Sequence, residues 1–372
     1  MRILHFYKTA YPDTMGGVEQ VIHQICKQSP RFGATSEVLA LSRHPSPTAL
    51  ELDGYKTHQV KEDIKIASTG FSIQAYSKFK ELAQQADIIN YHFPWPFMDI
   101  IHFASRIKKP SVVSYHSDIV VQKKLLKLYR PLQNKFLSSV DRIIVASPNY
   151  LESSAVLPSF REKISIIPIG LNKESYPVPS AAVKARWAEQ LPERFFLFVG
   201  VLRYYKGLHT LLEAVQGTGY TVVIVGDGPK KPELMEQAER LDLQNVHFLG
   251  KVNDEDKVAL IQLSTAIVFP SHLRSEAFGV ALLEGAMYGK PMISCEIGTG
   301  TTYINIANET GLTVPPENPT AFREAMRYVW DHPQEAAVMG EKALLRYTEL
   351  FTGDQMLRGY MKVYEDLMTK QR

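Results

Sequence analysis

Short β-rich runs alternate with longer helical patterns along the chain, and this alternation occurs twice. In the first half, the apolar runs 3–7, 87–91 and 141–146 are each followed by a stretch with helical spacing. The same order restarts at 195–199 and continues through 266–269. Strands that alternate with helices form parallel sheets covered by helices. We therefore predict an α/β fold with two Rossmann-like, doubly wound domains.

A proline-containing stretch near 170–190 separates the two halves, which suits a connection between domains. The 372 residues of the chain also exceed the length at which a single core stops growing. We predict a first domain over 1–175, a second over 190–350, and a C-terminal helix over 351–372 that crosses back to the first domain. Ligands of such sheets bind beyond the carboxyl ends of the strands, so we expect the site in a central cleft between the domains.

Charge is distributed unevenly along the chain, although the net charge is only +3. Basic residues exceed acidic ones in the first half, and the reverse holds in the second. The basic run 123–130 has leucines at helical spacing, which fits a helix on an anionic membrane surface. An ordinary amphipathic surface helix fits the same pattern. No arginine–aromatic pattern accompanies the run, so no nucleic-acid partner is expected.

Cysteine usage and hydropathy indicate the compartment. Cys26 and Cys295 lie far apart and match no metal or redox spacing, so we expect buried thiols in a reducing compartment. No apolar run approaches the length of a membrane span, and the first residues lack the pattern of a secretion signal. The prediction is a cytoplasmic protein, peripheral on the inner face of the cytoplasmic membrane.

Two glutamates, Glu276 and Glu284, stand eight residues apart in a stretch that we predict to be helical over 276–288. A helix would separate them by roughly 12 Å along its axis, because each residue adds about 1.5 Å. The paired acids of glycoside hydrolases lie only about 5–9.5 Å apart, which disfavours a hydrolase. Free amides of Phe278, Gly279 and Val280 would bind an anion between the two acids. Two solvated helix glutamates are the alternative.

Residues 275–291 closely resemble the signature of retaining glycosyltransferases of family 4, which have the GT-B fold. The resemblance implies that Glu276 contacts hydroxyls of the transferred sugar and that Glu284 holds the ribose hydroxyls of a nucleotide-sugar donor. It also implies that the segment Ala277, Phe278, Gly279 and Val280 lies against the donor diphosphate.

Further segments of the first half resemble the same family. Gly16 and Gly17 match its glycine-rich loop, where missing side chains let backbone amides approach a phosphate or acceptor; a simple turn is the alternative. His116 resembles the family's active-site histidine, and a satisfied polar residue is its alternative. Glu19 and His92 are predicted on the acceptor side.

Cationic residues of the second half resemble the pair that neutralises the leaving diphosphate. Lys206 matches this pair directly, whereas Arg203 lies two positions beyond the usual site of the arginine, where this chain has Val201. Fixed cations lower the barrier where charge develops on a leaving group. Gly226 resembles the family's turn beneath the nucleotide. The backbone at Lys251 and Val252 resembles the family's segment that contacts the base.

The residues predicted to be catalytic are therefore His116, Lys206 and Glu276, in a retaining reaction that needs no metal and no cofactor. The segments 90–96 and 200–207 look most like those of bacterial O-antigen and polysaccharide mannosyltransferases. This implies GDP-mannose or a related GDP-deoxyhexose as donor and a lipid-linked glycan as acceptor. No residue chemistry selects guanine over uracil, so a UDP-sugar transferase stays open. A GT-B epimerase, a phosphorylase and a non-catalytic binding protein are further alternatives.

Overall fold

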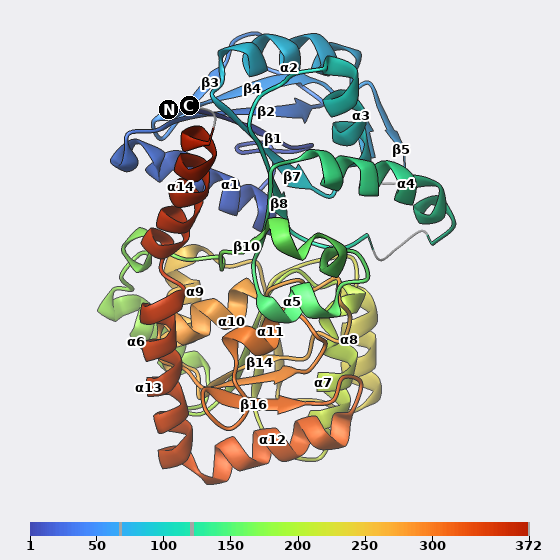
Figure 1. The fold of residues 1–372 in the computed structure, drawn as a ribbon. Helices are drawn as coiled ribbons and strands as arrows, with labels where there is room; N and C mark the ends of the chain where they lie inside the picture. The colour runs from blue at the N-terminus through green and yellow to red at the C-terminus, as the bar shows by residue number, and fades with distance from the viewer. Residues whose placement is uncertain (67–68, 120–122, 371–372) are drawn as a thin grey trace. The chain divides into compact units, whose positions relative to one another are not determined.

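The computed structural model of the chain describes residues 1–66, 69–119 and 123–370, without the side chains of 123 and 124. The chain forms two compact units (Figure 1). Unit 1 comprises Met1–Ala146, Ser154–Pro168 and Gly353–Arg372, and unit 2 comprises Ser147–Ser153 and Ile169–Thr352. In the described part of the chain, no helix is both long enough and apolar enough to cross a membrane.

Unit 1 is built on an eight-stranded sheet with the order β10-β9-β8-β7-β1-β2-β4-β3, in which only β3 is antiparallel to its neighbour. The order reverses between β1 and β7. The strands are β1 Arg2–Phe6, β2 Thr35–Ser42, β3 Leu50–Leu52, β4 Tyr55–Lys61, β7 Ile88–Phe93, β8 Ser111–Tyr115, β9 Arg142–Val145 and β10 Ile164–Ile166, beside a separate hairpin of β5 Ile64–Ile66 and β6 Thr69–Phe71.

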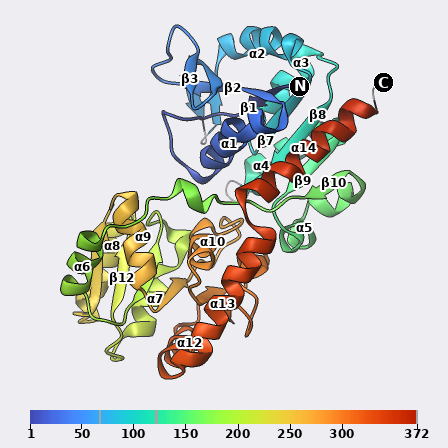
Figure 2. The same cartoon turned by 90° about the vertical axis from the view of Figure 1, so that its left-hand side faces the viewer.

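Helices cover this sheet, and their apolar faces fill its core. The helices of unit 1 are α1 Gly17–Gln28, α2 Ile73–Gln85, α3 Pro96–Ser105, α4 Lys123–Ser139 and α14 Gly353–Thr369, with 3-10 turns η1 Ser29–Phe32 and η2 Leu157–Lys163. The last helix of the chain, α14, packs in unit 1 beside α1 (Figure 2). Its buried residues include Tyr360 and Tyr364.

Unit 2 contains a six-stranded sheet that is parallel throughout, with the order β13-β12-β11-β14-β15-β16. Numbered within the unit this is 3-2-1-4-5-6, the order of a doubly wound dinucleotide-binding sheet, and it reverses between β11 and β14. The strands are β11 Phe196–Val199, β12 Val222–Val225, β13 Val246–Gly250, β14 Ala266–Phe269, β15 Met292–Cys295 and β16 Gly311–Val314. They are nearly continuous apolar runs, as expected of strands buried on both faces.

The helices of unit 2 connect these strands. They are α5 Pro148–Ser153, α6 Ala181–Gln190, α7 Leu208–Val215, α8 Lys231–Arg240, α9 Asp254–Leu263, α10 Val280–Met287, α11 Thr301–Ile304, α12 Pro319–Asp331 and α13 Pro333–Leu350, with 3-10 turns η3 Lys173–Ser175 and η4 Tyr204–Lys206. One expectation is corrected here: the helix predicted over 276–288 begins only at Val280.

Candidate active site

A buried ion pair lies at the carboxyl edge of the unit 2 sheet, between the segments that follow β11 and β14. Lys206 Nζ contacts Glu276 Oε2, and each side chain is only 11 % exposed. The hydroxyl of Ser271 donates to the same oxygen at 3.4 Å. Strand order reverses between β11 and β14, which is where doubly wound sheets bind their ligands. Two residues predicted from separate motifs thus meet at one point.

The close approach of these two segments depends on Gly207, which follows Lys206. Its φ of 69° lies in the left-handed region, and an added Cβ would stand 2.0 Å from the carbonyl oxygen of Pro270. No other residue fits here without moving the backbone. The glycine therefore lets the backbone that carries Lys206 pass directly against the segment that leads to Glu276.

Glu284 lies in α10, where it is 6 % exposed and has two partners from elsewhere in unit 2. Lys257 Nζ donates to Glu284 Oε1 at 2.9 Å, and the hydroxyl of Tyr176 donates to the same oxygen at 3.1 Å. Burial lowers the pKa of Lys257, but the charges of Glu284 and Asp254 outweigh it and raise that pKa above its ordinary value. Sequence reasoning missed Lys257 and Tyr176, because no motif links them to Glu284.

The start of α10 differs from the prediction. Gly279 takes a left-handed conformation with φ 100° at the N-cap, so the preceding residues, including Glu276, lie in a loop. The axial spacing of 12 Å therefore does not describe the two acids. The two acids have different partners, since Glu276 pairs with Lys206 and Glu284 with Lys257.

The loop before α10 still carries the predicted anion-binding segment. Ala277 and Phe278 precede Gly279, and Val280 is the first residue of the helix. The first backbone N–H groups of a helix have no hydrogen-bond partner within the helix. The positive end of the helix dipole adds to these amides. The arrangement at the N-terminus of α10 suits a phosphate group.

The other predicted donor residues of unit 2 follow neighbouring strands at the same sheet edge. Gly226 follows β12, and an added Cβ would stand 1.9 Å from the carbonyl oxygen of Gly200. Lys251 and Val252 follow β13 and are exposed and half-buried, respectively. Arg203 is exposed and lines a small pocket with Tyr204, His209 and Glu233 rather than joining the pair formed by Lys206.

Asp254 and Asp256 form an Asp-x-Asp pattern at the start of α9. Asp256 contacts Arg186 and accepts a hydrogen bond from Trp187 Nε1 at 2.9 Å. Asp254 pairs with Lys257 at 3.0 Å. Both acids are therefore engaged by cationic or indole groups of unit 2.

Unit 1 holds a chain of three histidines across neighbouring strands. His5 Nδ1 lies 3.0 Å from His92 Nε2, and His92 Nδ1 lies 2.9 Å from His116 Nε2. His116 is half-buried after β8, and its backbone N–H donates to the carbonyl of Phe93 at 3.1 Å. His5 was not predicted, although a histidine within the apolar run 3–7 was a visible signal.

His92 does not line an open acceptor face, and this prediction is corrected. It is 0 % exposed and lies between His5 and His116. The parallel register pairs His92 with Ser114 of β8, so its side chain is enclosed within the sheet. Its contacts make it a support behind His116.

Burial keeps the three imidazoles neutral. It lowers the pKa of His116 to about 4 and that of His5 to about 3, and it lowers the pKa of His92 together with the charges of its two neighbours. Asn90 Nδ2 lies 3.5 Å from His5 Nδ1 and faces it as a donor, which favours an unprotonated Nδ1 there. His92 then donates from Nε2 and His116 from Nε2. This pattern leaves His116 Nδ1 without a proton.

The C-terminal helix completes this network. Asn90 Nδ2 donates to the hydroxyl of Tyr364 at 2.9 Å, and Asn90 Oδ1 accepts from Ser114 Oγ at 3.1 Å. Ser114 Oγ also lies 3.1 Å from the hydroxyl of Tyr360. Two tyrosines of α14 are thus connected through buried polar groups to the chain that ends at His116.

The glycine loop of unit 1 precedes α1. Gly16 is the N-cap, and a Cβ on Gly17 would meet nothing within 4 Å, so open space lies beside the start of the helix. Glu19 Oε1 accepts hydrogen bonds from Thr9 at 2.7 Å and Thr14 at 2.9 Å. Glu19 therefore anchors the loop itself, a role that differs from the predicted acceptor contact.

The strand orders of both units, together with the site of unit 2, fit the GT-B class of glycosyltransferase. Residues 15–175 match the family described as Glycosyltransferase Family 4, and residues 181–346 match Glycosyl transferases group 1. The chain is 61 % identical over 352 residues to D-rhamnosyltransferase WbpZ of Pseudomonas aeruginosa, covering 95 % of this chain and 92 % of that protein. The chain therefore belongs to the glycosyltransferase family that these two matches and this relative define.

A second relative and two solved structures agree with this assignment. O-antigen chain mannosyltransferase C of Escherichia coli is 48 % identical over 99 % of both chains. Sucrose-phosphate synthase of Thermosynechococcus elongatus has a TM-score of 0.82 at 19 % identity, covering 99 % of both chains. Anabaena HepE, in complex with UDP and glucose, has a TM-score of 0.77 at 19 % identity, covering 98 % of this chain and 99 % of that one. These structures confirm the GT-B fold.

Proposed function

We propose that the protein is a hexosyltransferase of O-antigen synthesis that transfers a manno-configured sugar from its GDP donor to a hydroxyl of a lipid-linked glycan. The ion pair of Lys206 and Glu276 at the switch point of unit 2 carries the proposal, because a leaving diphosphate needs a fixed cation and a sugar needs an acceptor for its hydroxyls. The two relatives, a D-rhamnosyltransferase and an O-antigen chain mannosyltransferase, support the sugar class.

Each part of the donor has a partner in unit 2. Lys206 and the first-turn amides of α10 stabilise the departing diphosphate, because the charge that develops there meets dipoles already in place. Glu276, oriented by Lys206, accepts hydrogen bonds from sugar hydroxyls. Glu284, held by Lys257 and Tyr176, does the same for the ribose.

The reaction forms a bond between the anomeric carbon and an acceptor oxygen and breaks the bond to the diphosphate. The acceptor hydroxyl passes its proton to an oxygen of the departing diphosphate, whose remaining negative charge is stabilised by Lys206. We propose retention of configuration and no requirement for a metal at the diphosphate, since fixed basic groups take that place. We propose that His116, with Nδ1 unprotonated, acts as a hydrogen-bond acceptor in the reaction, the role that the family resemblance implies.

D-rhamnose is 6-deoxy-D-mannose, so the two sugars differ only at C6, which is a hydroxymethyl group in mannose and a methyl group in rhamnose. A donor panel of GDP-mannose, GDP-D-rhamnose and UDP-glucose, with and without a synthetic lipid-linked acceptor, tests the proposal. We expect acceptor-dependent GDP release from one of the GDP donors, unchanged by EDTA. Acceptor-dependent UDP release would identify a UDP-sugar transferase, and turnover without acceptor would indicate an epimerase or hydrolase.

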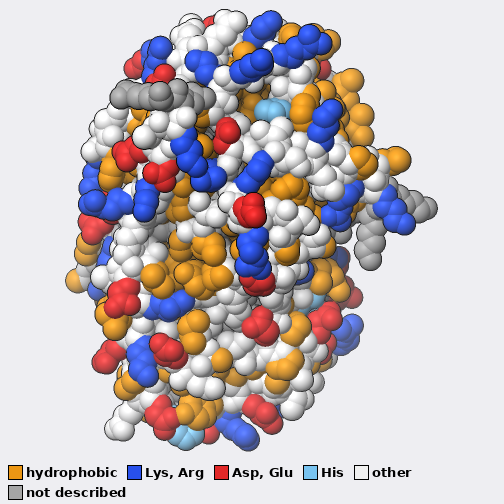
Figure 3. Space-filling model, viewed as in Figure 1, with side chains coloured by type: hydrophobic (Ala, Val, Ile, Leu, Met, Phe, Trp, Pro, Cys, Tyr) orange, Lys and Arg blue, Asp and Glu red, His pale blue; other side chains and the backbone are white. Residues whose placement is uncertain are grey.

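A lipid-linked acceptor places the site near a membrane, and unit 1 carries exposed apolar side chains that suit such a surface. Leu125 and Leu128 of α4 are 52 % and 81 % exposed, and Ile64 and Ile66 of β5 are each 60 % exposed. Figure 3 shows apolar side chains gathered around β5 and α4, with basic ones beside them. A helix of this type lies in the membrane interface.

The change Leu128→Glu should reduce flotation of the protein with anionic phospholipid vesicles, because it replaces a membrane-facing apolar group by a like charge. Leu345→Glu is the matched control, since Leu345 is 58 % exposed on α13 of unit 2. Equal flotation of both variants and the unchanged protein would contradict membrane binding through α4. The lysines at 123 and 124 belong to the same predicted basic run, but their side chains lie outside the described residues.

A further inference from the structure

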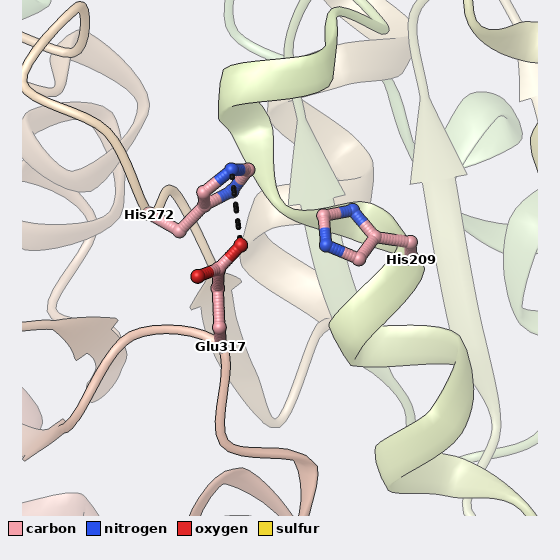
Figure 4. Close-up of side chains that lie close together, drawn as sticks. All are labelled: His209, His272 and Glu317. Carbon is pink, nitrogen blue, oxygen red and sulfur yellow. Dashed lines mark ion pairs between the residues drawn. The ribbon is translucent and has the colours of Figure 1, made fainter.

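Three side chains able to bind a metal converge in unit 2, apart from the residues of the candidate active site. His209 lies in the first turn of α7, His272 follows β14, and Glu317 lies between β16 and α12. One potential ligand atom of each lies within 4.8 Å of the others. Figure 4 shows the three side chains pointing toward one another. Parallel strands bring the three segments to the same edge of the sheet.

His272 is buried without a satisfied ring nitrogen. Its side chain is 0 % exposed, and neither Nδ1 nor Nε2 has a hydrogen-bond partner among the described residues. Nε2 lies 3.7 Å from Glu317 Oε1, which is too long for a hydrogen bond. Buried polar groups nearly always have a partner, so this exception requires an explanation. A cation held between the two groups would supply one.

Neighbouring groups restrict how both imidazoles lie. Tyr204 stacks on His209 with ring centroids 5.5 Å apart, and it meets His272 edge to face at 4.9 Å. An added Cβ on Gly207 would stand 3.2 Å from His272 Nδ1, so the backbone closes that side of the ring. Nε2 is left on the side of Glu317.

We propose that His209, His272 and Glu317 bind one divalent transition-metal ion, for which zinc is the best fit. Two imidazoles and one carboxylate suit zinc, copper or nickel, whereas magnesium and calcium prefer oxygen ligands alone. Three protein ligands leave the fourth tetrahedral position of zinc open to water.

The ligand geometry requires only a small closure. Ligand atoms about 2.0–2.2 Å from a tetrahedral zinc lie roughly 3.3 Å apart. Glu317, with a side chain that is 59 % exposed, is free to rotate inward toward His272 and His209.

A metal ion at this position would join the segments that follow β11, β14 and β16. Gly207, which contacts His272, directly follows Lys206, and Glu276 is four residues beyond His272. The ion would therefore fix the backbone on which the Lys206–Glu276 pair is mounted. It takes no ligand from that pair, so its role differs from that of a metal that binds the donor diphosphate.

Titration of the full-length chain, prepared without a histidine tag and freed of metal by a chelator, tests the proposal without any substrate. We expect Co²⁺ to bind with one equivalent and to show the visible absorption of tetrahedral cobalt, which Zn²⁺ then abolishes. Zn²⁺ should also raise the Tm, because it binds the folded state. His209→Asn and Glu317→Gln should each weaken Co²⁺ binding at least about tenfold, since losing even the groups behind the ligands costs 10–100-fold.

His332→Asn is the matched control, because His332 is exposed and lies in unit 2 outside the cluster. It should bind one equivalent with unchanged affinity. Circular dichroism and the Tm of each metal-free variant show whether a loss reflects the ligand or the fold. The proposal is overturned if the unchanged protein binds no stoichiometric metal, or if binding survives in both His209→Asn and Glu317→Gln. Binding lost only in His116→Asn would place the metal in unit 1 and would overturn it as well.

Discussion

Lys206 and Glu276 hold each other in place before any substrate binds. Both groups are almost fully buried, so their charges are already removed from water at the point where a diphosphate would depart. Charges fixed in this way cost no reorganisation during the reaction. Glu276 also compensates the buried charge of Lys206, because an isolated buried charge is strongly unfavourable.

Lys206→Met should lower kcat about 100- to 1,000-fold, the range found when one preorganised group is removed from a developing charge. Steady-state kinetics with the active GDP donor measures the effect. Lys230→Met is the control, because Lys230 is a more exposed lysine of the same sheet edge that pairs with Glu233. A kcat within a few-fold of the unchanged protein would exclude Lys206 from the reaction.

The single replacement leaves Glu276 without its cation, which itself destabilises the protein. The double variant Lys206→Met/Glu276→Gln removes both charges and should recover Tm without recovering kcat. Recovery of both quantities together would mean that the lysine acts on stability alone.

The histidine chain makes unit 1 sensitive to acid. The pKa of His116 is lowered from 6.5 to about 4, so between these values the unfolded chain binds more protons than the folded one. Stability therefore falls as pH decreases through this range and is complete above about 6.5. A shift of this size corresponds to about 3 kcal/mol.

His116→Gln should flatten the decline of Tm between pH 7 and pH 5, because it removes one group that must stay neutral. Differential scanning calorimetry at several pH values measures the slope. The exposed His332→Gln should leave the slope unchanged. A slope for His116→Gln equal to that of the control would show that His116 is not held neutral by the fold.

At the scale of helices and strands, apolar patterning predicted most strands of both sheets but missed β4. β4, Tyr55–Lys61, was missed because its sequence alternates polar and apolar groups near the edge of the sheet, where one side faces water. The start of α10 was placed too early because 276–279 is largely apolar. The helix begins only after Gly279, because this glycine takes a left-handed conformation. That conformation depends on the contacts of Gly279 and not on hydropathy.

The residues of the candidate site were also predictable only where local sequence identified them. Lys206, Glu276, Glu284 and His116 were recognisable because they belong to local motifs. Their partners, such as Lys257 for Glu284, come from distant segments and were unpredictable without the strand order.

Gly279→Ala should both destabilise the protein and weaken GDP binding. A left-handed conformation costs an alanine about 1–2 kcal/mol, and its Cβ would stand 3.2 Å from Leu282 Cδ1 at the start of α10. Calorimetric titration with GDP and a thermal melt measure the two effects. Relief of this strain would turn the first-turn amides away from the phosphate.

Gly217→Ala separates these two effects. Gly217 has a φ of 72° with nothing within 4 Å of its Cβ, and it lies in the turn after α7. It should lose a similar amount of stability while GDP affinity stays the same. Equal GDP affinity in both variants would exclude the start of α10 from diphosphate binding.

At the scale of the whole chain, the two units differ in how they are assembled from the sequence. Unit 2 consists almost entirely of the continuous segment Ile169–Thr352, whereas unit 1 takes Met1–Ala146, Ser154–Pro168 and Gly353–Arg372 from around it. Unit 1 is therefore incomplete without the segment Gly353–Thr369, which forms α14. Its final helix, α14, buries Leu357 and Tyr364 among other side chains.

A variant that ends at Thr352 should lose the calorimetric transition of unit 1 and keep that of unit 2, together with GDP binding. Without α14, the apolar groups that it covers become exposed, and Asn90 loses the hydroxyl of Tyr364 to which it donates. A variant that ends at Thr369 retains the whole helix and should keep both transitions. If the shorter variant also kept both, α14 would be dispensable for unit 1. Its hydrogen bonds to the histidine chain would then not be needed for the stability of unit 1. If it lost both, the two units would fold as one cooperative unit, and the stability of unit 2 would also depend on α14.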